Sequence, residues 1–458
     1  MARFRKQPPR PPSRRAFLYS LVSAPLAGGR TLDDYRIYAE HPRLFLNARR
    51  LRLLRRERER DSMRWRQFDA LVSGGAQMPE EGFALALHYQ VSTNEALGKR
   101  AVAWALEESN RDLRQLALVY DWCQEVLGDE QRAALARRIR GAIRQDRGPS
   151  GVSSARSAVL GAVSIAEQAP GDCAARLASV VDEWWEKQVS PGLASGARPV
   201  PRKEIFALFE LLHAIRDNIQ IDLRDGVRRY FAALPFYLLL SYYPATYPAA
   251  ENDYRIPAFA GAGRPDLEAA ALSRAAELAM VAYDTNAEEN QFLQGWLIHD
   301  RFLLRGPYGI PYEFLWANPY QPGLSYTHAA LLHHDPAAGR LFVRSSWDED
   351  ARWFGLFDGE MQVFEGGAIT VLDPRRPREA LEIGGVTLLF GERGMKFSQE
   401  RQPEGRFFVL GLRPKAVYRV EVDDEELREE RTDAGGTLAL RFPPGGRAGV
   451  RLHLPGGP

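Results

Sequence analysis

Residues 205–215 read IFALFELLHAI, and this stretch does most to decide the fold. Apolar residues stand at nearly every position, so a helix built from the stretch has no polar face. A helix that is apolar on every side is buried on every side. We therefore expect residues 205–215 to form a central helix with other helices packed around it.

Helical patterns continue on both sides of this stretch. In residues 129–144, for example, Leu135, Ile139 and Ile143 recur at every fourth position and give the helix one apolar stripe. Many such amphipathic segments follow one another with short polar breaks and no strand pattern between them. This arrangement predicts helical hairpins that form an (α/α) toroid over residues 40–304.

The pattern changes after residue 305. Residues 306–311 (GPYGIP) are rich in turn formers, and short alternating or apolar stretches follow, separated by Gly, Pro or Asp. Their spacing predicts an antiparallel β-sandwich over residues 305–395. Residues 396–458 continue the pattern, as a C-terminal β lobe that completes the sandwich or as a small separate β module. The expected strands are 340–344, 353–357, 361–364, 368–372, 386–390, 407–410, 417–422, 437–442 and 449–454.

The first 29 residues have the layout of a twin-arginine export signal. A basic, Pro-rich start leads to Arg14 and Arg15, and residues 19–27 are mildly apolar and end in small residues. No later segment reaches the roughly twenty apolar residues that a membrane-spanning helix needs. We therefore expect a periplasmic or secreted protein with no membrane anchor after removal of residues 1–29. The alternative for these residues is a disordered basic tail.

Composition argues against several classes of protein. Lys plus Arg (61) nearly equals Asp plus Glu (59), so we expect no uniformly basic surface for nucleic acid. Two cysteines in 458 residues rule out a disulfide framework. The sequence has no phosphate-binding Gly-rich loop, no dinucleotide fingerprint and no nucleophile elbow. We expect no nucleic-acid partner, no cofactor and no metal.

Three motifs occur along the chain: HPRLFL at 41–46, LVYDWC at 118–123 and RSSWD at 344–348. In type and order they resemble motifs of the heparinase II/III-like polysaccharide lyases. The resemblance implies an (α/α) toroid followed by a β-sandwich, and cleavage of an acidic polysaccharide by β-elimination. That reaction needs a group that neutralises a uronate carboxylate, and groups that remove a ring proton and protonate the leaving oxygen.

The sequence departs from the family pattern at three expected catalytic positions. GVSSARS at 151–157 stands where an Asn or His is expected, and PRKEIF at 201–206 stands where a Tyr is expected. Beyond Trp347 the only histidine is His453, so the family's sandwich His has no counterpart. Two hypotheses stay open: a lyase with replaced catalytic residues, or a non-catalytic relative that binds glycan or a protein.

Candidate site residues come from two polar loops, residues 144–157 and 190–203, and from the helix-to-linker region at 242–255. Arg156 on the first loop, and Arg202 and Lys203 on the second, could bind a substrate carboxylate, the arginines through two parallel hydrogen bonds. Solvated loop charge is the alternative. Tyr254 could act as an acid or base beside Arg255, which could contact substrate, or the tyrosines of this region could fill a domain junction.

Histidines near the expected junction could replace the missing family His. His299 ends the last helix and His328 lies near the start of the sandwich. Each could instead be a hydrogen-bonded structural residue. The densest aromatic block contributes Tyr312, Trp316 and Tyr326, either as a platform for sugar rings or as packing between helices and strands.

Overall fold

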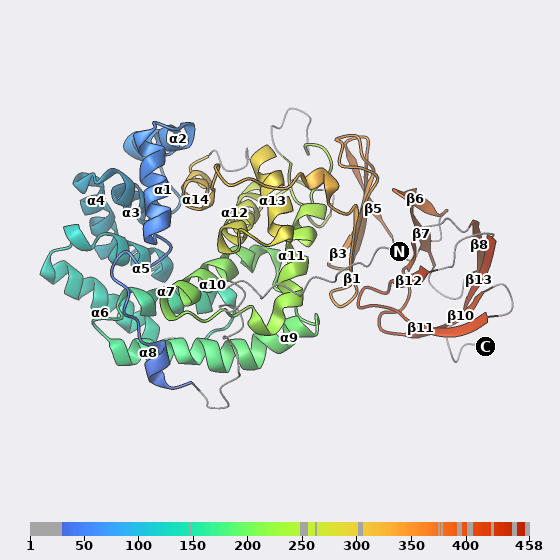
Figure 1. The fold of residues 1–458 in the computed structure, drawn as a ribbon, viewed down its shortest axis with the longest axis horizontal. Coiled ribbons are helices and arrows are strands. Elements are labelled where there is room, and N and C mark those ends of the chain that lie inside the picture. Colours follow the sequence, from blue (N-terminus) through green and yellow to red (C-terminus); the bar gives the residue numbers. More distant parts are fainter. Residues whose placement is uncertain are drawn as a thin grey trace, which may run out of the picture.

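Helices form the first part of the molecule and strands form the opposite end (Figure 1). This division confirms the coarse expectation of a helical region followed by strands. The expected export signal, residues 1–29, and Tyr254 lie outside the described residues. The computed structural model describes residues 30–145, 148–247, 255–261, 263–300, 306–373, 376, 379–391, 396–400, 406–422, 426–441 and 447–453.

The helices begin shortly after the start of the described chain and continue past residue 304. Among the described residues, no helix combines the length and the apolar character needed to cross a membrane. The α-helices are α1 Ala48–Glu59, α2 Met63–Ser73, α3 Glu81–Ser92, α4 Glu95–Leu106, α5 Leu113–Trp122, α6 Asp129–Gln145, α7 Val152–Ser164, α8 Pro170–Ala178, α9 Ser190–Ala194, α10 Ile205–Ile219, α11 Arg228–Leu240, α12 Leu267–Tyr283, α13 Glu288–His299 and α14 Ile310–Trp316. The 3-10 helices are η1 Leu32–Tyr35, η2 Gln124–Val126, η4 Arg202–Glu204, η5 Asp225–Val227 and η7 Tyr326–His328, and η3 Ser179–Val189 is a π-helix.

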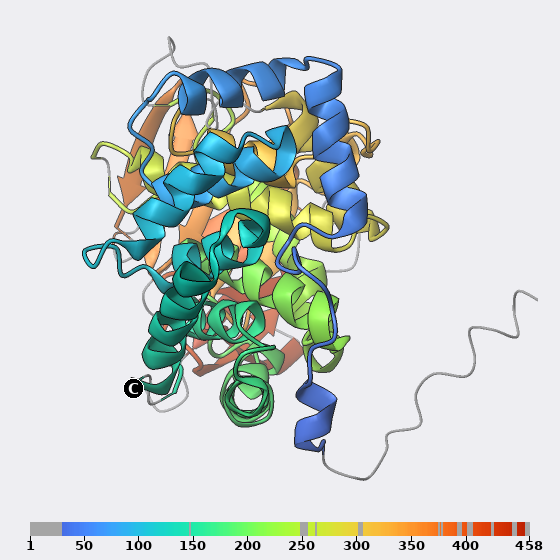
Figure 2. The same ribbon diagram turned by 90° about the vertical axis from the view of Figure 1, so that its left-hand side faces the viewer.

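The expected central helix is α10. Every residue from Ile205 to Ile215 is buried, and α7 and α12 pack against α10. Contacts run from α3 through α5, α7, α10, α12 and α14, and α14 returns to α3. This path of contacts therefore closes on itself. Figure 2 shows the molecule with its helical end, on the left in Figure 1, facing the viewer. Helix α14, late in the chain, consequently lies next to α2 and α3, near its start.

Two of the motifs that carry the family resemblance meet in a buried contact. The carboxylate of Asp121 accepts the backbone N–H of Arg43 at 3.0 Å and that of Leu44 at 2.8 Å. The same carboxylate lies 2.5 Å from Nδ1 of His41. Trp122 donates from Nε1 to the carbonyl of Leu44 at 2.9 Å. Because Asp121 and Trp122 are almost completely buried, these contacts hold residues 41–44 against α5.

The strands form three sheets. The first sheet has the order β1-β2-β3-β4-β5, the middle sheet β12-β9-β7-β6 and the outer sheet β11-β10-β13-β8. Among the described strands, β7 and β9 pair in parallel, and the other pairs are antiparallel. The strands are β1 Leu332–Asp335, β2 Arg340–Arg344, β3 Trp353–Phe357, β4 Glu360–Glu365, β5 Ala368–Leu372, β6 Leu381–Ile383, β7 Val386–Phe390, β8 Lys396–Glu400, β9 Arg406–Leu410, β10 Val417–Val422, β11 Glu426–Arg431, β12 Leu438–Arg441 and β13 Arg447–His453.

The sheets stack in layers. Leu388 of the middle sheet packs in one apolar cluster with residues of the first sheet, such as Phe354. Its neighbour Leu389 packs in another cluster with residues of the outer sheet, such as Val420. Successive strand residues point to opposite faces, so the middle sheet is covered on both sides. The expectation of an antiparallel β-sandwich is corrected in one respect, because β7 and β9 pair in parallel; the described strands form three layers.

The first sheet also packs directly on the helices. Phe342 and Trp353 belong to the same apolar cluster as the helical core. Trp353 donates from Nε1 to the carbonyl of Leu240 at 2.8 Å, and Tyr243 donates to Oε1 of Gln362 at 2.8 Å. Helix α14 lies beyond the expected boundary at residue 304, yet it packs against α2, α3 and α12. The helices and one face of the first sheet therefore share one core.

Candidate anion-binding site

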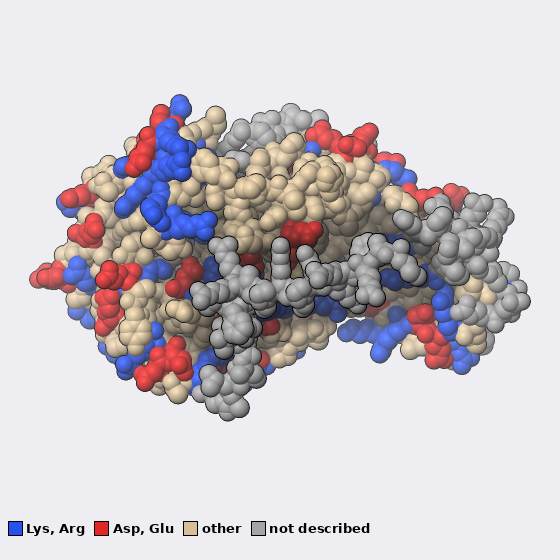
Figure 3. All heavy atoms as spheres, viewed as in Figure 1, with Lys and Arg blue, Asp and Glu red and all other residues tan. Residues whose placement is uncertain are grey.

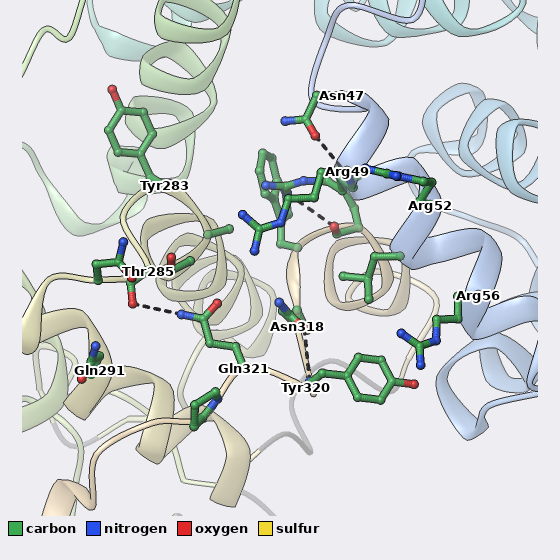
Figure 4. A pocket seen from close by; sticks show the side chains of 18 of the residues that line it. Asn47, Arg49, Arg52, Arg56, Tyr283, Thr285, Gln291, Asn318, Tyr320 and Gln321 are labelled. Carbon is green, nitrogen blue, oxygen red and sulfur yellow. Dashed lines mark hydrogen bonds between the residues drawn. The ribbon is translucent and has the colours of Figure 1, made fainter. Parts of the chain in front are cut away.

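A hollow of about 810 Å³ lies where the first α-helix faces the last ones. One side is α1; the other consists of the end of α12, the segment after it, and the end of α14 with its following loop (Figure 4). Five arginines line the hollow, and its lining includes no Asp, Glu or His. We call it the arginine pocket, after Arg49, Arg50, Arg52 and Arg56 of α1 and Arg216 of α10.

Three of these arginines form an exposed row on α1. Arg49, Arg52 and Arg56 are spaced by three and four residues, which places them on one side of a helix. Within the described part of the chain, none of the three has an acidic partner, and Arg52 donates only to the carbonyl of Ala48, at 3.2 Å. Figure 3 shows Lys and Arg side chains gathered over this part of the molecule. The row therefore presents positive charge that no neighbouring carboxylate neutralises.

The start of α1 adds to this positive potential. The side chain of Asn47 accepts the backbone N–H of Arg50 at 3.0 Å and so caps the helix. The first turn contains no acidic residue that would offset the positive end of the helix dipole. The positive end of the helix dipole and the guanidinium groups consequently both favour an anion in the arginine pocket.

Arg50 lies deeper than the row. Its guanidinium is 4.3 Å from the ring centroid of Trp316, and it donates one long hydrogen bond of 3.5 Å to the carbonyl of Leu315. Burial, together with the charges of Arg216 and Arg49, lowers the pKa of Arg50 to about 10, although Asp217 acts in the opposite direction. An anion in the pocket would relieve this unfavourable environment.

Tyr283 forms a fixed wall of the pocket. The guanidinium of Arg216 lies 3.6 Å from its ring centroid and that of Arg224 lies 4.4 Å from it. The Tyr283 hydroxyl donates to Asp222 at 3.1 Å. Burial, then the charge of Asp222, raises the pKa of Tyr283, so its phenol keeps its proton. This tyrosine shapes the pocket and is poorly suited to proton transfer.

Tyr320 lies at the rim of the pocket and is 49% exposed. The guanidinium groups of Arg56 and Arg60 lie 5.6 and 5.7 Å from its ring centroid. Its hydroxyl donates to Glu57 at 2.5 Å. An exposed ring among cations offers a flat apolar face of the kind that suits a sugar ring.

The loop that carries Tyr320 packs backbone to backbone on α13. A Cβ atom on Gly295 would come within 1.9 Å of the carbonyl oxygen of Leu324, and one on Gly323 would come within 2.3 Å of the backbone nitrogen of Gly295. The Leu324 N–H donates to the carbonyl of Gln291 at 3.0 Å. Glycine is therefore required on both sides of this contact, which holds one rim of the arginine pocket.

Replacement of Gly295 by alanine is expected to push the loop at residues 318–324 off α13. We expect a loss of about 1–3 kcal/mol in the free energy of unfolding, because the new methyl group overpacks the contact. Faster hydrogen exchange in the loop would report the displacement. Gly141→Ala is the matched control, since Gly141 lies inside α6 with open space around it; this change should stabilise the protein by up to about 1 kcal/mol. Equal exchange in both variants would contradict the prediction.

Two arginines expected to bind substrate are bound by buried carboxylates instead. Arg156 donates to Glu210 at 2.7 Å. Arg202 donates to Ser273 at 2.7 Å and to Ser241, and it lies 3.5 Å from Glu277. Both guanidinium groups thus have partners within the protein, and their assignment to a substrate carboxylate stays a prediction. Lys203 is exposed, and its assignment stays a prediction.

The two other aromatic candidates that lie in α14 have different surroundings. Tyr312 is only 2% exposed, donates to Glu80 and packs against the rings of Phe83 and Phe206. This environment favours packing between structural elements over a platform for sugar rings, the two alternatives for the aromatic block. Trp316 is equally buried, but it lines the arginine pocket beneath Arg50.

Three predicted residues gather around Trp296, away from the arginine pocket. The ring of Tyr326 lies 5.3 Å from that of Trp296, His299 lies 5.7 Å from Tyr326, and the Arg255 guanidinium lies 5.4 Å from Trp296. Arg255 also donates to Glu349 at 2.6 Å. We call these residues the Trp296 cluster. His328 is exposed, two residues after Tyr326, and has no ring contact among the described residues.

The arginine pocket was not among the sites predicted from the sequence, although the sequence contains a signal for it. Residues 49–60 hold seven arginines and two glutamates, an excess of charge that a surface helix does not need. The opposite wall, from Tyr283 and Tyr320, could not be anticipated, because it lies more than 200 residues away along the chain.

Among the described residues no group of three or more His, Cys, Asp or Glu side chains could hold a metal ion.

Comparison with known proteins places the chain in no family. No protein-family model matches it, and no curated relative matches it. Among solved structures, one described as "Glycoside hydrolase" is similar over 82% of this chain and 71% of that chain, with 10% sequence identity and a TM-score of 0.30. This likeness is too distant to define the fold or the activity of the chain.

Proposed function

We propose that this protein binds acidic polysaccharide in the arginine pocket. The observation that carries the proposal is the lining itself: five arginines and no acidic residue, with an exposed aromatic ring at the rim. Guanidinium groups bind carboxylates and sulfates through paired, charge-assisted hydrogen bonds. The pocket contains no imidazole or carboxylate to move a proton, which favours binding over catalysis at this place.

The proposal includes an (α/α) toroid that presents the pocket and export of the protein to the periplasm or beyond. The closed path of helix contacts supports the toroid. The paired arginines and mildly apolar segment within residues 1–29 support export by the twin-arginine route. An exported protein meets polysaccharides of the cell surface and surroundings, which suits this ligand.

Electrophoresis in native gels tests the binding. Migration of the full chain should be retarded in gels cast with alginate, heparan sulfate, chondroitin sulfate or pectate, and unchanged in gels cast with a neutral glucan. Retardation should weaken as salt is added, because exposed charges are screened. Equal migration in every gel would refute the proposal.

A second candidate function is β-elimination at the Trp296 cluster, as in heparinase II/III-like lyases. What supports it is the gathering of an imidazole, a phenol and a guanidinium around one ring. His299 and Tyr326 would exchange protons with the substrate. Arg255 pairs with Glu349, whose side chain is 78% exposed, so a substrate carboxylate could take the place of Glu349.

A lyase leaves an unsaturated product that absorbs in the far ultraviolet. If the Trp296 cluster acts as proposed, Tyr326→Phe and His299→Ala should each reduce the rate by about 10²–10⁴-fold, the usual contribution of a general acid or base. His328→Ala is the control, because it removes an exposed imidazole two residues from Tyr326 and should leave the rate unchanged. No product from the unaltered protein on any acidic polysaccharide would leave binding as the function.

A further inference from the structure

Arg344, at the end of β2, is a buried arginine that no carboxylate of the described chain neutralises. The residue is 2% exposed, and its side chain donates only to backbone carbonyls: Nε to that of Ser346 at 3.2 Å and Nη1 to that of Tyr242 at 3.2 Å. Burial, and then the charge of Arg255, lowers the pKa of Arg344 to about 9. A buried guanidinium in these surroundings is stabilised by an anion.

One nitrogen of Arg344 stays accessible to such an anion. Nη2 makes no hydrogen bond with a described residue, yet it is not one of the partnerless side-chain atoms that are fully buried, as Nε of Arg274 is. The ring centroid of Trp347, a partly buried residue, lies 4.6 Å from the guanidinium. Nη2 is therefore the atom through which Arg344 can bind an anion.

Arg255 joins the same two chain segments as Arg344, residues 242–244 and the loop at 346–349. Its Nε donates to a carbonyl of the first segment at 2.7 Å, and its Nη2 donates to Glu349, in the second, at 2.6 Å. The two guanidinium groups thus lie between the same parts of the chain. A carboxylate that contacts both gains two charge-assisted partners.

Glu349 shows that a carboxylate fits beside these arginines. Its side chain is 78% exposed, while that of Arg255 is 11% exposed. Among the described residues, the Glu349 carboxylate accepts a hydrogen bond from Arg255 and none from Arg344. An ion pair with so exposed a partner contributes little to stability. A carboxylate that contacts both arginines should therefore displace Glu349.

We propose that Arg344 and Arg255 form a two-arginine site for one carboxylate of a uronate sugar, and that Glu349 occupies part of this site until the ligand displaces it. The partly buried rings of Tyr326 and Trp347 lie 5.5 Å apart beside the site and suit the face of a sugar ring. The inference deepens the second candidate function, because elimination needs this contact with the carboxylate. Binding itself can be measured without elimination.

Titration calorimetry on the full chain with two matched sugars tests this proposal. Glucuronate should bind in a saturable manner, whereas glucose, which has no carboxylate, should bind at least about tenfold more weakly. Absence of saturable glucuronate binding, or equal binding of glucose, would overturn the proposal. Saturable binding by a protein that forms no unsaturated product would support the two-arginine site and refute elimination.

Two exposed carboxylates of one loop locate the binding. Glu349→Gln removes the competing carboxylate and should tighten glucuronate binding about three- to fivefold, the contribution of one exposed ion pair. Asp350→Asn is the matched control, because Asp350 is exposed on the same loop and pairs with no cation among the described residues. Its affinity should be unchanged. Equal effects of the two changes, or weaker binding by Glu349→Gln, would overturn the assignment.

Two arginine variants separate the two-arginine site from the arginine pocket. Arg344→Gln should weaken glucuronate binding about tenfold, the effect expected of losing one charge-assisted partner. Arg52→Gln should leave it unchanged. If Arg52→Gln weakened binding while Glu349→Gln left it unchanged, glucuronate would bind in the arginine pocket, and the proposal would be overturned. The Glu349 variant decides the matter even if Arg344→Gln does not fold, because it alters only an exposed loop.

Discussion

Replacing Glu210 by alanine is expected to lower the free energy of unfolding by about 3–5 kcal/mol, the usual effect of breaking a buried ion pair. Glu210 is fully buried in α10 and accepts hydrogen bonds from Arg114 at 2.6 Å and from Arg156 at 2.7 Å. Burial alone would lower the pKa of Arg114, but the charges of Glu210 and Glu80 raise it well above its ordinary value. Without Glu210, Arg114 would remain charged inside the core with much of its compensation gone.

Denaturant unfolding followed by circular dichroism measures this loss. Glu95→Ala is the matched control: Glu95 pairs with Lys99 at 3.0 Å, and both side chains are largely exposed. An exposed pair of this kind contributes at most about 1 kcal/mol. Similar losses in the two variants would mean that Glu210 does not hold the helical core together as its contacts indicate.

Simultaneous replacement of Arg49, Arg52 and Arg56 by glutamine is expected to weaken binding of acidic polysaccharide roughly 30-fold. Each exposed charge pair contributes up to about 1 kcal/mol, so three together contribute about 2 kcal/mol or somewhat more. The three side chains lie on one side of α1 and have no acidic partner among the described residues, so their loss should disturb the fold little. The salt dependence of binding should become shallower, because fewer counterions are released.

Affinity for one acidic polysaccharide, measured at several salt concentrations, tests this expectation. Arg137→Gln is the control, since Arg137 is exposed on α6 and lies outside the arginine pocket. It should change neither the affinity nor the salt dependence appreciably. If the triple variant bound as tightly as the unaltered protein, the polysaccharide would have to bind elsewhere, and the Trp296 cluster would be the next place to examine.

The helical half and the central helix could be predicted from sequence because both follow from local periodicity. The arrangement of the strands could not. Residues 386–390 (VTLLF) form a continuous apolar run, and all five are buried in β7. Such a run indicates a strand covered on both faces, which is the signature of a middle layer. The parallel pairing of β7 with β9 arises because the chain passes through β8 of the outer sheet between them. The periodicity of the sequence does not predict this connection.

The binding residues were harder to predict than the fold, because the sequence does not show which side chain a charged residue pairs with. Arg156 and Arg202 stand on polar loops, and their neighbours in sequence gave no reason to expect buried carboxylates nearby. The carboxylate was nevertheless visible: Glu210 interrupts an otherwise apolar helix, and a buried acid requires a cation. Glu210 thus indicates a buried cation nearby, while the arginines of residues 49–60 far outnumber the acids around them.

The layered packing of helices and sheets limits where the chain can be shortened. A chain that ends at residue 304 would lose α14 and the first sheet, and would uncover the apolar side of the helices that meets Phe342 and Trp353. A chain that ends at residue 395 would instead uncover the apolar residues of β7 that β9 and the outer sheet protect. Either product would expose a large apolar patch and tend to aggregate. The protein should therefore be produced and assayed at its full length, even when only the arginine pocket is of interest.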